Sequence, residues 1–516
     1  MAGAVAPLLL ASCSLKVKVQ EDWRPSYRQA IPLGEAARAW AELKAGRMPT
    51  EADLELYNTV VRDSVVQIAR GRTGDDVIGP VLKTDAGEVE LRVDSAAIPD
   101  FTFEEKIVPA DFVKVRQGLR AQSVVSGVGA PLIVRRPRSE ADPMIPESGL
   151  WVPVTALLHL DQPGNPVLEL VDPTRRRSVT YGGRSFPLSA NYTAAFARDF
   201  QGRQLQFENL TGLFRFEQFA DRMGISRATP LDPAKEVCVF IHGINSSPST
   251  WDEVLNRLYG DEAIRDRYEF WLFGYPTGAP IPYMAAEFRA AVHRMLEFRH
   301  SQGAGPQRVT VVGHSMGGLL AKSLTFSGGD ADWNRLFKVP LDQLDIRENE
   351  REELRRMIYF EPIPEVRRVV FCAVPHRGSR LVEQPAAKLL GDVVQVPAQL
   401  LVLSAQIIAQ SANALTPEGF EFARDRLTSI DQLRAETWVT SEFLNKPLNP
   451  AVSYHSLIGN FSVADRPAEK SNDGVVPYSS SHLDGVASEH IVRPAGHSVH
   501  RTGAGIEEIR RILKLP

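Results

Sequence analysis

Residues 309–320 constrain the fold more than any other stretch of this chain. Val309–Val312 are all β-branched and predict a short buried strand, and the apolar run that begins at Leu319 suits a helix. Between them two glycines flank a central serine, in Gly313-His314-Ser315-Met316-Gly317. Glycines leave room for the close backbone packing of a sharp turn, and such a turn holds the serine hydroxyl clear of the sheet edge. The segment therefore predicts a strand, a strained turn that presents Ser315, and a helix.

The length and the composition set the class of protein. A chain of 516 residues is long enough for two or three domains. Hydrophobic residues make up 43% of it and charged residues 24%, which is typical of a soluble globular protein. The net charge of −4 offers no overall attraction to nucleic acid. The basic clusters 135–138 and 175–177 are interpreted as solvated loops and not as phosphate sites.

The three cysteines point to two different roles. Cys238 and Cys372 fall in apolar, strand-like runs and are expected in the core, so no disulfide framework is indicated. Leu8–Cys13 resembles the lipobox of bacterial lipoproteins, although no Lys or Arg precedes the apolar run. We therefore expect residues 1–13 to be a lipoprotein signal. Lipidated Cys13 would then anchor the protein to a membrane of the cell envelope, facing the periplasm.

Changes in composition divide the remainder of the chain. Residues 14–88 predict a tether followed by helical segments, one of them amphipathic and capped at its start by Thr50. Residues 89–190 hold short apolar runs separated by Gly, Pro and Asp, which predicts a β-rich accessory domain. Residues 191–231 return to a helical pattern and are expected to form a bridge to a last domain, 232–516.

The last domain alternates strand-like and helix-like runs, which predicts an α/β fold with a doubly wound, mostly parallel sheet. The candidate strands are 236–241, 268–273, 309–312, 367–373, 451–458 and 490–493. Two insertions, 324–367 and 379–451, follow strands whose carboxyl ends hold the ligand in open α/β sheets. Both are candidate lids, and the second contains the apolar stretch 393–408.

A serine hydroxyl is a weak nucleophile, so Ser315 needs donors for a developing oxyanion. The strand 237–241 ends at His242-Gly243, and this arrangement lets the N–H of Ile244 point into the site. The second candidate donor is the N–H of Met316, the residue after the serine. His242 is interpreted as a packed loop histidine without a role in proton transfer.

Ser315 also needs a base, and the base needs an acid to orient it. Asp473 follows the strand 451–458 and precedes a glycine, which favours it as the acid over Asp465 in the same loop. His497 comes directly after a glycine and soon after a strand, which favours it as the base over His500.

Five motifs in order carry a resemblance to a known family. They are His242-Gly243, Gly313-His314-Ser315-Met316-Gly317-Gly318, Pro375-His376-Arg377-Gly378-Ser379, Asp473-Gly474-Val475-Val476-Pro477 and Gly496-His497. With them, the segment from about 235 to 516 resembles the α/β-hydrolase lipases and esterases, in particular bacterial triacylglycerol-lipase-like and exported esterases. The first 230 residues carry no motif of a well-described domain.

The resemblance implies a serine hydrolase that cleaves carboxylic esters. Ser315 would be the nucleophile, Asp473 the acid and His497 the base, with His242, Gly243, Tyr275 and His376 as pocket candidates. The resemblance also implies that the strands of Cys238 and Cys372 flank the nucleophile strand, too far apart for a disulfide.

The substrate is expected to be a small-molecule or lipid ester. Trp251, Tyr275, Ile281 and Tyr283 are expected to border the cleft, or else to be core residues. A thioesterase, an amidase or an acyltransferase would use the same residues, and a catalytically silent envelope interaction protein is the alternative from another class. No metal-ligand cluster, phosphate loop or dinucleotide fingerprint occurs, so neither a cofactor nor a metal is expected.

Overall fold

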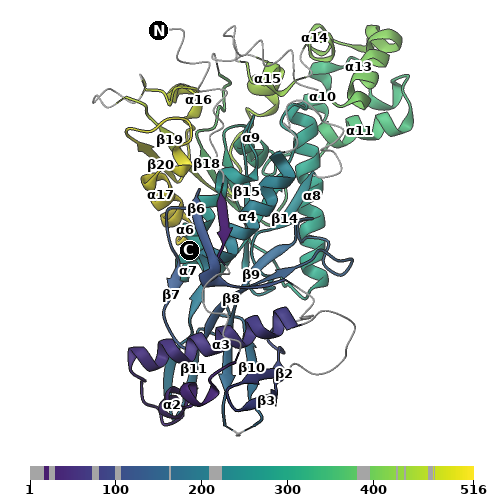
Figure 1. The fold of residues 1–516 in the computed structure, drawn as a ribbon. Helices are drawn as coiled ribbons and strands as arrows, with labels where there is room; N and C mark the ends of the chain where they lie inside the picture. The colour runs from purple at the N-terminus through teal and green to yellow at the C-terminus, as the bar shows by residue number, and fades with distance from the viewer. Residues whose placement is uncertain are drawn as a thin grey trace. The chain divides into compact units, whose positions relative to one another are not determined.

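The computed structural model describes residues 17–22, 30–71, 81–98, 106–161, 164–208, 223–379, 396–425, 428–434, 437–462, 469 and 471–516. Contacts divide the chain into two compact units. The N-terminal unit comprises Leu15–Gln204 together with Leu255–Asp266, and the C-terminal unit comprises Leu205–Val254 and Arg267–Pro516. Figure 1 labels the helices and strands of both units.

A five-stranded sheet forms the centre of the N-terminal unit, in the order β4-β10-β9-β8-β5. Its strands are β4 (Arg92–Asp94), β5 (Ile107–Pro109), β8 (Ala130–Arg136), β9 (Leu150–His159) and β10 (Val167–Val171). β10 pairs in parallel with β4, and the other pairs are antiparallel. The central strand β9 is buried along almost its whole length, as its continuous apolar sequence predicts.

Four short two-stranded ladders complete the β structure of this unit. They pair β1 (Lys18–Glu21) with β6 (Val113–Gln117), β2 (Val81–Thr84) with β3 (Gly87–Glu90), β7 (Val124–Val125) with β13 (Ala190–Asn191), and β11 (Ser178–Tyr181) with β12 (Arg184–Pro187). A 3-10 turn, Ala110–Phe112, joins β5 to β6.

Two helices share the core of this sheet. They are α2 (Leu33–Lys44) and α3 (Glu51–Gly71), and Thr50 caps α3 by accepting a hydrogen bond from the Asp53 amide. The Tyr57 hydroxyl of α3 hydrogen-bonds both the carbonyl and the amide of Leu158 on β9. The sequence predicts separate segments for residues 14–88 and 89–190. In the structure, the apolar stripe of α3 is buried in one core with the strands of the five-stranded sheet.

The N-terminal unit also takes a segment from the middle of the predicted last domain. After α4 (Tyr192–Glu208), the chain enters the C-terminal unit and returns along α6 (Asp252–Gly260) and α7 (Glu262–Arg267). The ring of Tyr259 lies edge-on to those of Tyr192 and Phe196, at 5.7 and 5.1 Å. The predicted boundary at residue 232 places 255–266 in the last domain, whereas in the structure these residues belong to the N-terminal unit. The burial of Tyr259 against Tyr192 and Phe196 accounts for this position.

The C-terminal unit is built on a seven-stranded sheet in the order β14-β16-β15-β17-β18-β19-β20. Its strands are β14 (Gly224–Arg227), β15 (Glu236–Ile241), β16 (Tyr268–Gly274), β17 (Val309–His314), β18 (Val366–Cys372), β19 (Ser453–Gly459) and β20 (Ser488–Val492). Only the edge strand β14 is antiparallel to its neighbour among these described strands. The predicted fold class is confirmed.

The sequence prediction fails at β14, which lies inside the predicted helical bridge 191–231. Four residues of mixed polarity give no periodic signal, so this strand is specified by its pairing with β16. The six other strands lie within two or three residues of their predicted ends.

Helices cover the sheet of the C-terminal unit. α8 (Ile281–Ser301) packs against β14, α9 (Met316–Lys322) against β17, and α17 (Gly503–Leu513) against β19 and β20. Short turns of helix lie at Pro248–Trp251, Val499–Arg501 and α16 (Tyr478–Ser481).

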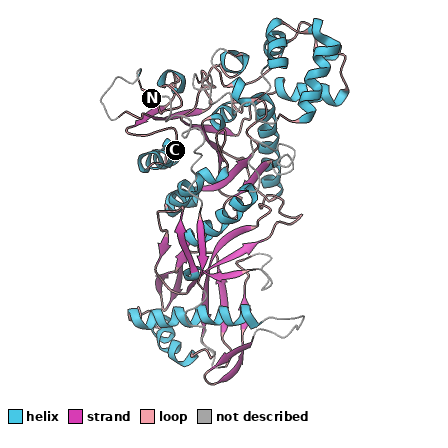
Figure 2. Ribbon diagram, turned by 45° about the horizontal axis from the view of Figure 1, so that its top comes forward, coloured by secondary structure: helices cyan, strands magenta, loops and turns pink. Residues whose placement is uncertain are grey.

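The two insertions are helical and pack on each other. The first carries α10 (Asp330–Leu336), a 3-10 turn (Leu341–Gln343) and α11 (Glu348–Ile358). The second carries α13 (Ala398–Ser411), a 3-10 turn (Ala412–Ala414), α14 (Pro417–Asp425), α15 (Ser429–Gln432) and a π-helical turn (Val439–Phe443). α14 contacts both α10 and α13, and Figure 2 shows the helices of the insertions gathered at one end of the sheet. Of the apolar stretch 393–408, residues 393–395 lie outside the described residues.

Cys238 on β15 and Cys372 on β18 are free and buried, and their strands flank β17. Both the strand order and the free thiols confirm the prediction. Burial raises the pKa of both thiols. Cys13 lies outside the described residues. Within the described part of the chain, no helix is both long enough and apolar enough to cross a membrane.

Candidate active site

Ser315 stands on a strained turn between β17 and α9. Its φ of 53° and ψ of −127° place a non-glycine residue in a sparsely populated region of backbone conformation. Two close approaches explain the flanking glycines. A Cβ at Gly313 would lie 2.6 Å from backbone atoms of Gly317 and Gly318, and a Cβ at Gly317 would lie 2.4 Å from the His242 carbonyl oxygen. The strained serine that the motif predicts is therefore present.

The side chains of Ser315, His497 and Asp473 form one hydrogen-bonded row. His497 Nε2 lies 2.9 Å from Ser315 Oγ, and His497 Nδ1 lies 2.8 Å from Asp473 Oδ2. Since Asp473 Oδ2 can only accept when ionised, Nδ1 carries the proton and Nε2 is the acceptor that faces the serine hydroxyl. Ser315 and Asp473 are buried, and the His497 side chain is 20% exposed. The three residues come from the ends of β17, β19 and β20.

The loop after β19 holds the Asp473 carboxylate in place. Its second oxygen, Oδ1, accepts hydrogen bonds from the amides of Val475 and Val476 at 2.8 and 2.6 Å. Gly474 has a φ of +89°, so the Asp-Gly turn allows the following amides to fold back onto the carboxylate. The competing residue, Asp465, lies outside the described residues.

His500 lies beside this row without joining it. Its Nε2 is 2.9 Å from Thr250 Oγ1, and its ring lies 4.7 Å from that of Trp251. On its other side the ring packs at 4.1 Å against His314. Burial lowers the pKa of His500 well below its ordinary value. Of the two candidate bases, the structure therefore places His497 on Ser315.

Two backbone amides are positioned as candidate oxyanion donors. Met316 is the first residue of α9, where helical amides have no partner within the helix. Among the described residues, neither the Met316 amide nor the Ile244 amide meets a hydrogen-bond acceptor. The next residue, Asn245, has a φ of 50°, and its amide donates to Thr277 Oγ1 at 3.1 Å. Thr277 thus fixes the loop that carries Ile244.

The side chains of His242 and Tyr275 pack against each other next to the loop that carries Ile244. Their rings stack at 4.3 Å, and the Tyr275 hydroxyl donates to the His242 carbonyl at 2.7 Å. His242 Nδ1 donates to the Gly243 carbonyl at 3.0 Å, while its Nε2 accepts from the Tyr275 amide at 3.4 Å. Burial lowers the pKa of His242 to about 4, so its ring is neutral at pH 7. These contacts support the interpretation of His242 as a packed histidine.

Gly243 lies against the nucleophile, whereas His376 packs at the end of β18. A Cβ at Gly243 would lie 2.8 Å from the Ser315 Cβ, so this position admits only glycine without displacement. His376 is buried with its ring 4.6 Å from that of Phe371, and its amide donates to the Ser480 carbonyl at 3.0 Å. Burial lowers the pKa of His376 well below its ordinary value.

Three of the four residues expected at the cleft are buried in the core. Trp251 is fully buried between Phe240 and His500, and Ile281 and Tyr283 are buried in the first turn of α8. The core alternative therefore applies to these three.

Sequence reasoning missed His314 and Thr277. His314 Nε2 donates to the His497 carbonyl at 2.9 Å, and burial lowers the pKa of its ring well below the ordinary value. For His314, the only signal in the sequence was its position next to Ser315. No feature of the sequence pointed to Thr277.

This arrangement can activate a hydroxyl and stabilise an anion. His497 can take the Ser315 proton, Asp473 can stabilise the resulting imidazolium, and the two amides can bind an oxyanion. Within the described ranges, no group of three His, Cys, Asp or Glu side chains is arranged to hold a metal ion.

Comparisons with solved structures find lipases among those that match. A Bacillus licheniformis lipase in its mature form is 15% identical, with a TM-score of 0.33 over 56% of this chain and 98% of that one. A Paleococcus ferrophilus monoacylglycerol lipase is 14% identical, with a TM-score of 0.30 over 57% and 98%. The Legionella pneumophila phospholipase PlaB, in complex with thio-NAD, is 14% identical, with a TM-score of 0.33 over 55% and 59%.

No curated protein matches this chain. The sequence model of the alpha/beta hydrolase family, however, matches residues 238–508, which hold Ser315, Asp473 and His497. Because that match spans more than half of the chain, this protein belongs to the alpha/beta hydrolase family.

Proposed function

We propose that this protein is a serine hydrolase that cleaves carboxylic esters through an acyl-enzyme intermediate. The observation that carries the proposal is the hydrogen-bonded row from Ser315 Oγ through His497 to Asp473 Oδ2. The strained backbone of Ser315 and the two amides without acceptors support it. The row supplies a nucleophile, a base and an orienting acid, which together make up the machinery of acyl transfer.

Each chemical step has a residue to perform it. His497 Nε2 takes the Ser315 proton as Oγ attacks the ester carbonyl carbon, and the amides of Ile244 and Met316 donate to the oxyanion. The tetrahedral intermediate collapses when His497 returns that proton to the departing alcohol. Water, activated by the same imidazole, then attacks the acyl-enzyme and releases the acid. Asp473 accepts the hydrogen bond from His497 Nδ1 and stabilises the imidazolium.

The test compares Ser315→Ala with the parent on short p-nitrophenyl esters and with a fluorophosphonate probe. We expect kcat to fall by several orders of magnitude and labelling to disappear in the variant. Ser479→Ala is the matched control, because Ser479 is an exposed serine elsewhere in the C-terminal unit. Hydrolysis by Ser315→Ala at the parent rate would show that Ser315 is not the nucleophile, and a parent protein that neither hydrolyses the esters nor labels would show that the fold is catalytically silent.

We further propose that Cys13 is lipidated and anchors the protein in the cell envelope. The support is the lipobox-like sequence Leu8–Cys13. The full chain should then sediment with membranes and incorporate labelled palmitate, and Cys13→Ser should do neither. Label retained in Cys13→Ser would contradict the proposal.

A further inference from the structure

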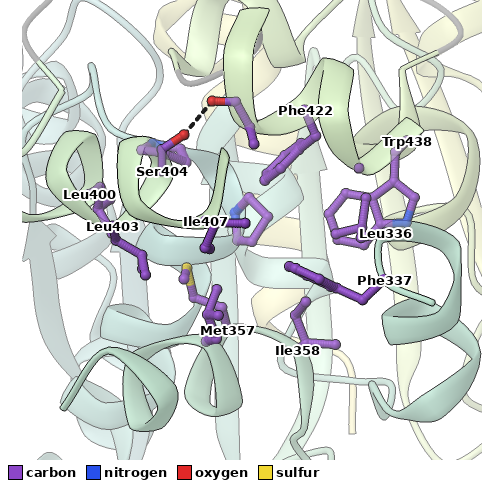
Figure 3. A pocket seen from close by; sticks show the side chains of 15 residues that line it. Leu336, Phe337, Met357, Ile358, Leu400, Leu403, Ser404, Ile407, Phe422 and Trp438 are labelled. Carbon is purple, nitrogen blue, oxygen red and sulfur yellow. Dashed lines mark hydrogen bonds between the residues drawn. The ribbon is translucent and has the colours of Figure 1, made fainter. Parts of the chain in front are cut away.

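An apolar cavity lies between the two insertions of the C-terminal unit. Fifteen residues line it, mostly from α10, α11, α13 and α14, and none of them is charged. Figure 3 shows Phe337, Ile407 and Phe422 converging on this space. The single hydroxyl of the lining, on Ser404, donates to the Ala423 carbonyl, so it is already satisfied. Apart from this hydroxyl and the indole N–H of Trp438, the side chains of the lining are apolar, so the cavity offers a ligand mainly apolar contact.

One short segment connects this cavity to the Ser315 site. At one end of the segment, Tyr275 stacks on His242, and Thr277 accepts the hydrogen bond from the Asn245 amide. At the other end, Pro280 and Pro282 line the cavity. Three residues of chain span at most about 11 Å, so Pro280 lies within that distance of Thr277. This short distance is within the reach of a chain-like group bound at Ser315.

The second insertion holds this segment in place. The Ser429 amide of α15 donates to the Gly278 carbonyl at 3.2 Å, and its hydroxyl donates to the Thr277 carbonyl. Gln432 accepts a hydrogen bond from the Ile281 amide at 2.7 Å. The insertion that forms one wall of the cavity thus also fixes the loop beside the nucleophile.

We infer that this cavity binds the aliphatic acyl chain of the ester, an inference that rests on the proposed function. The cavity has a volume of about 70 Å³, so it holds a short run of methylene groups and not a long acyl chain in full. Since the first carbons of the chain must cross from Ser315 to Pro280, the preferred substrates are esters of medium-length fatty acids. Each methylene that enters the cavity favours the reaction about fourfold.

The experiment measures kcat/KM on soluble p-nitrophenyl esters from acetate to decanoate. Ala423→Leu fills the cavity, and Leu403→Ala enlarges it. Ala405→Leu is the matched control, because it makes the same change on the exposed face of α13. We expect Ala423→Leu to lower the octanoate-to-acetate ratio at least tenfold, Leu403→Ala to shift the preference to longer esters, and Ala405→Leu to keep the ratio within twofold of the parent.

The outcomes separate this inference from the proposed function. If both cavity variants keep the parent ratio while Ser315→Ala abolishes all ester hydrolysis, the acyl chain binds elsewhere and only the cavity inference fails. If Ser315→Ala retains hydrolysis, the proposed function itself fails. Should circular dichroism show that Ala423→Leu does not fold, the shift in Leu403→Ala decides alone.

Discussion

Five histidines of the C-terminal unit are buried, and burial lowers the pKa of each. They are His242, His314, His376, His455 and His500. Two of them make contacts next to the candidate site. His242 stacks on Tyr275 beside the loop that carries Ile244, and His314 donates to the carbonyl of His497. The imidazole that contacts Ser315 Oγ is that of His497.

The buried histidines predict sensitivity to acid. For His242 the folded pKa is about 4 and the ordinary value is 6.5, so between these values the unfolded chain binds the proton and the folded chain does not. Stability is therefore fully present above pH 6.5 and is lost as the pH falls towards 4, by about 2 kcal/mol at pH 5 for this residue alone. Urea unfolding at pH 7 and pH 5 measures the loss.

His242→Phe keeps the stacked ring and removes the titration. The fall in the free energy of unfolding between pH 7 and pH 5 should then be about 2 kcal/mol smaller than in the parent. The exposed residue His293 provides the control variant His293→Phe, which should keep the parent's pH dependence. An identical pH dependence in parent and His242→Phe would contradict the prediction.

His314 is expected to position the base. Its Nε2–H bond holds the backbone of His497, so His314→Phe should leave the base misplaced and lower kcat by about 10- to 100-fold with little change in KM. His314→Gln retains a donor and should recover part of the loss. Steady-state kinetics on one short ester distinguishes this role from a structural one, in which both variants would lose activity together with stability.

At the scale of elements, a buried ion pair joins β16 to α8. Arg299 donates to Glu269, and both side chains are almost fully buried. Arg299 also donates to the Lys235 carbonyl at 2.7 Å and to Gln307 Oε1 at 2.9 Å. The pair thus ties the second strand of the sheet to the helix that begins at the cavity, and removing one partner leaves a buried charge alone.

Arg299→Met is therefore expected to lower the free energy of unfolding by about 3–5 kcal/mol. The double variant Glu269→Met/Arg299→Met should recover much of this loss, because no unpaired charge remains. Arg510→Met, which removes a partly exposed pair with Glu507, should cost under about 1 kcal/mol. Chemical denaturation of the parent and the three variants measures these losses. Equal losses in Arg299→Met and in the double variant would contradict the view that the unpaired charge of Glu269 causes the loss.

At the scale of the whole molecule, the chain passes twice through the N-terminal unit. The connection between β15 and β16 leaves the C-terminal unit and places 255–266 in the N-terminal one. There Tyr259 packs on Tyr192 and Phe196, and the Arg265 guanidinium lies 4.4 Å from the centre of the Tyr192 ring. Residues 255–266 lie within the sequence that matches the hydrolase family, yet their side chains complete the core of the N-terminal unit.

Residues 223–516 expressed alone should consequently expose an apolar surface around Tyr259. We expect this fragment to bind the dye ANS and to aggregate at concentrations at which the full chain does not aggregate. Tyr259→Lys within the fragment should reduce both effects. Light scattering and ANS fluorescence provide the measurements, and a fragment as soluble as the full chain would refute the expectation.

Local sequence determined the elements that carry the chemistry. The glycines at 313 and 317 allow the sharp turn at Ser315, and the Asp-Gly pair at 473 allows the turn that holds the Asp473 carboxylate. Runs of β-branched residues predict the strands. All three features depend on the backbone conformation of a few neighbouring residues. The residue types, their order and most strand limits could therefore be predicted without coordinates.

Only the tertiary structure decided which of these groups meet. His497, and not His500, contacts Ser315, and His314 holds the backbone of His497. The strand β14 pairs at the edge of the sheet. Residues 255–266 fold with residues that come before 205 in the sequence. The cavity likewise forms between two insertions, and their nearest lining residues, Ile358 and Leu400, are more than 40 residues apart in sequence. Such pairings depend on the shape and burial of surfaces distant along the chain, and local sequence carries no signal for them.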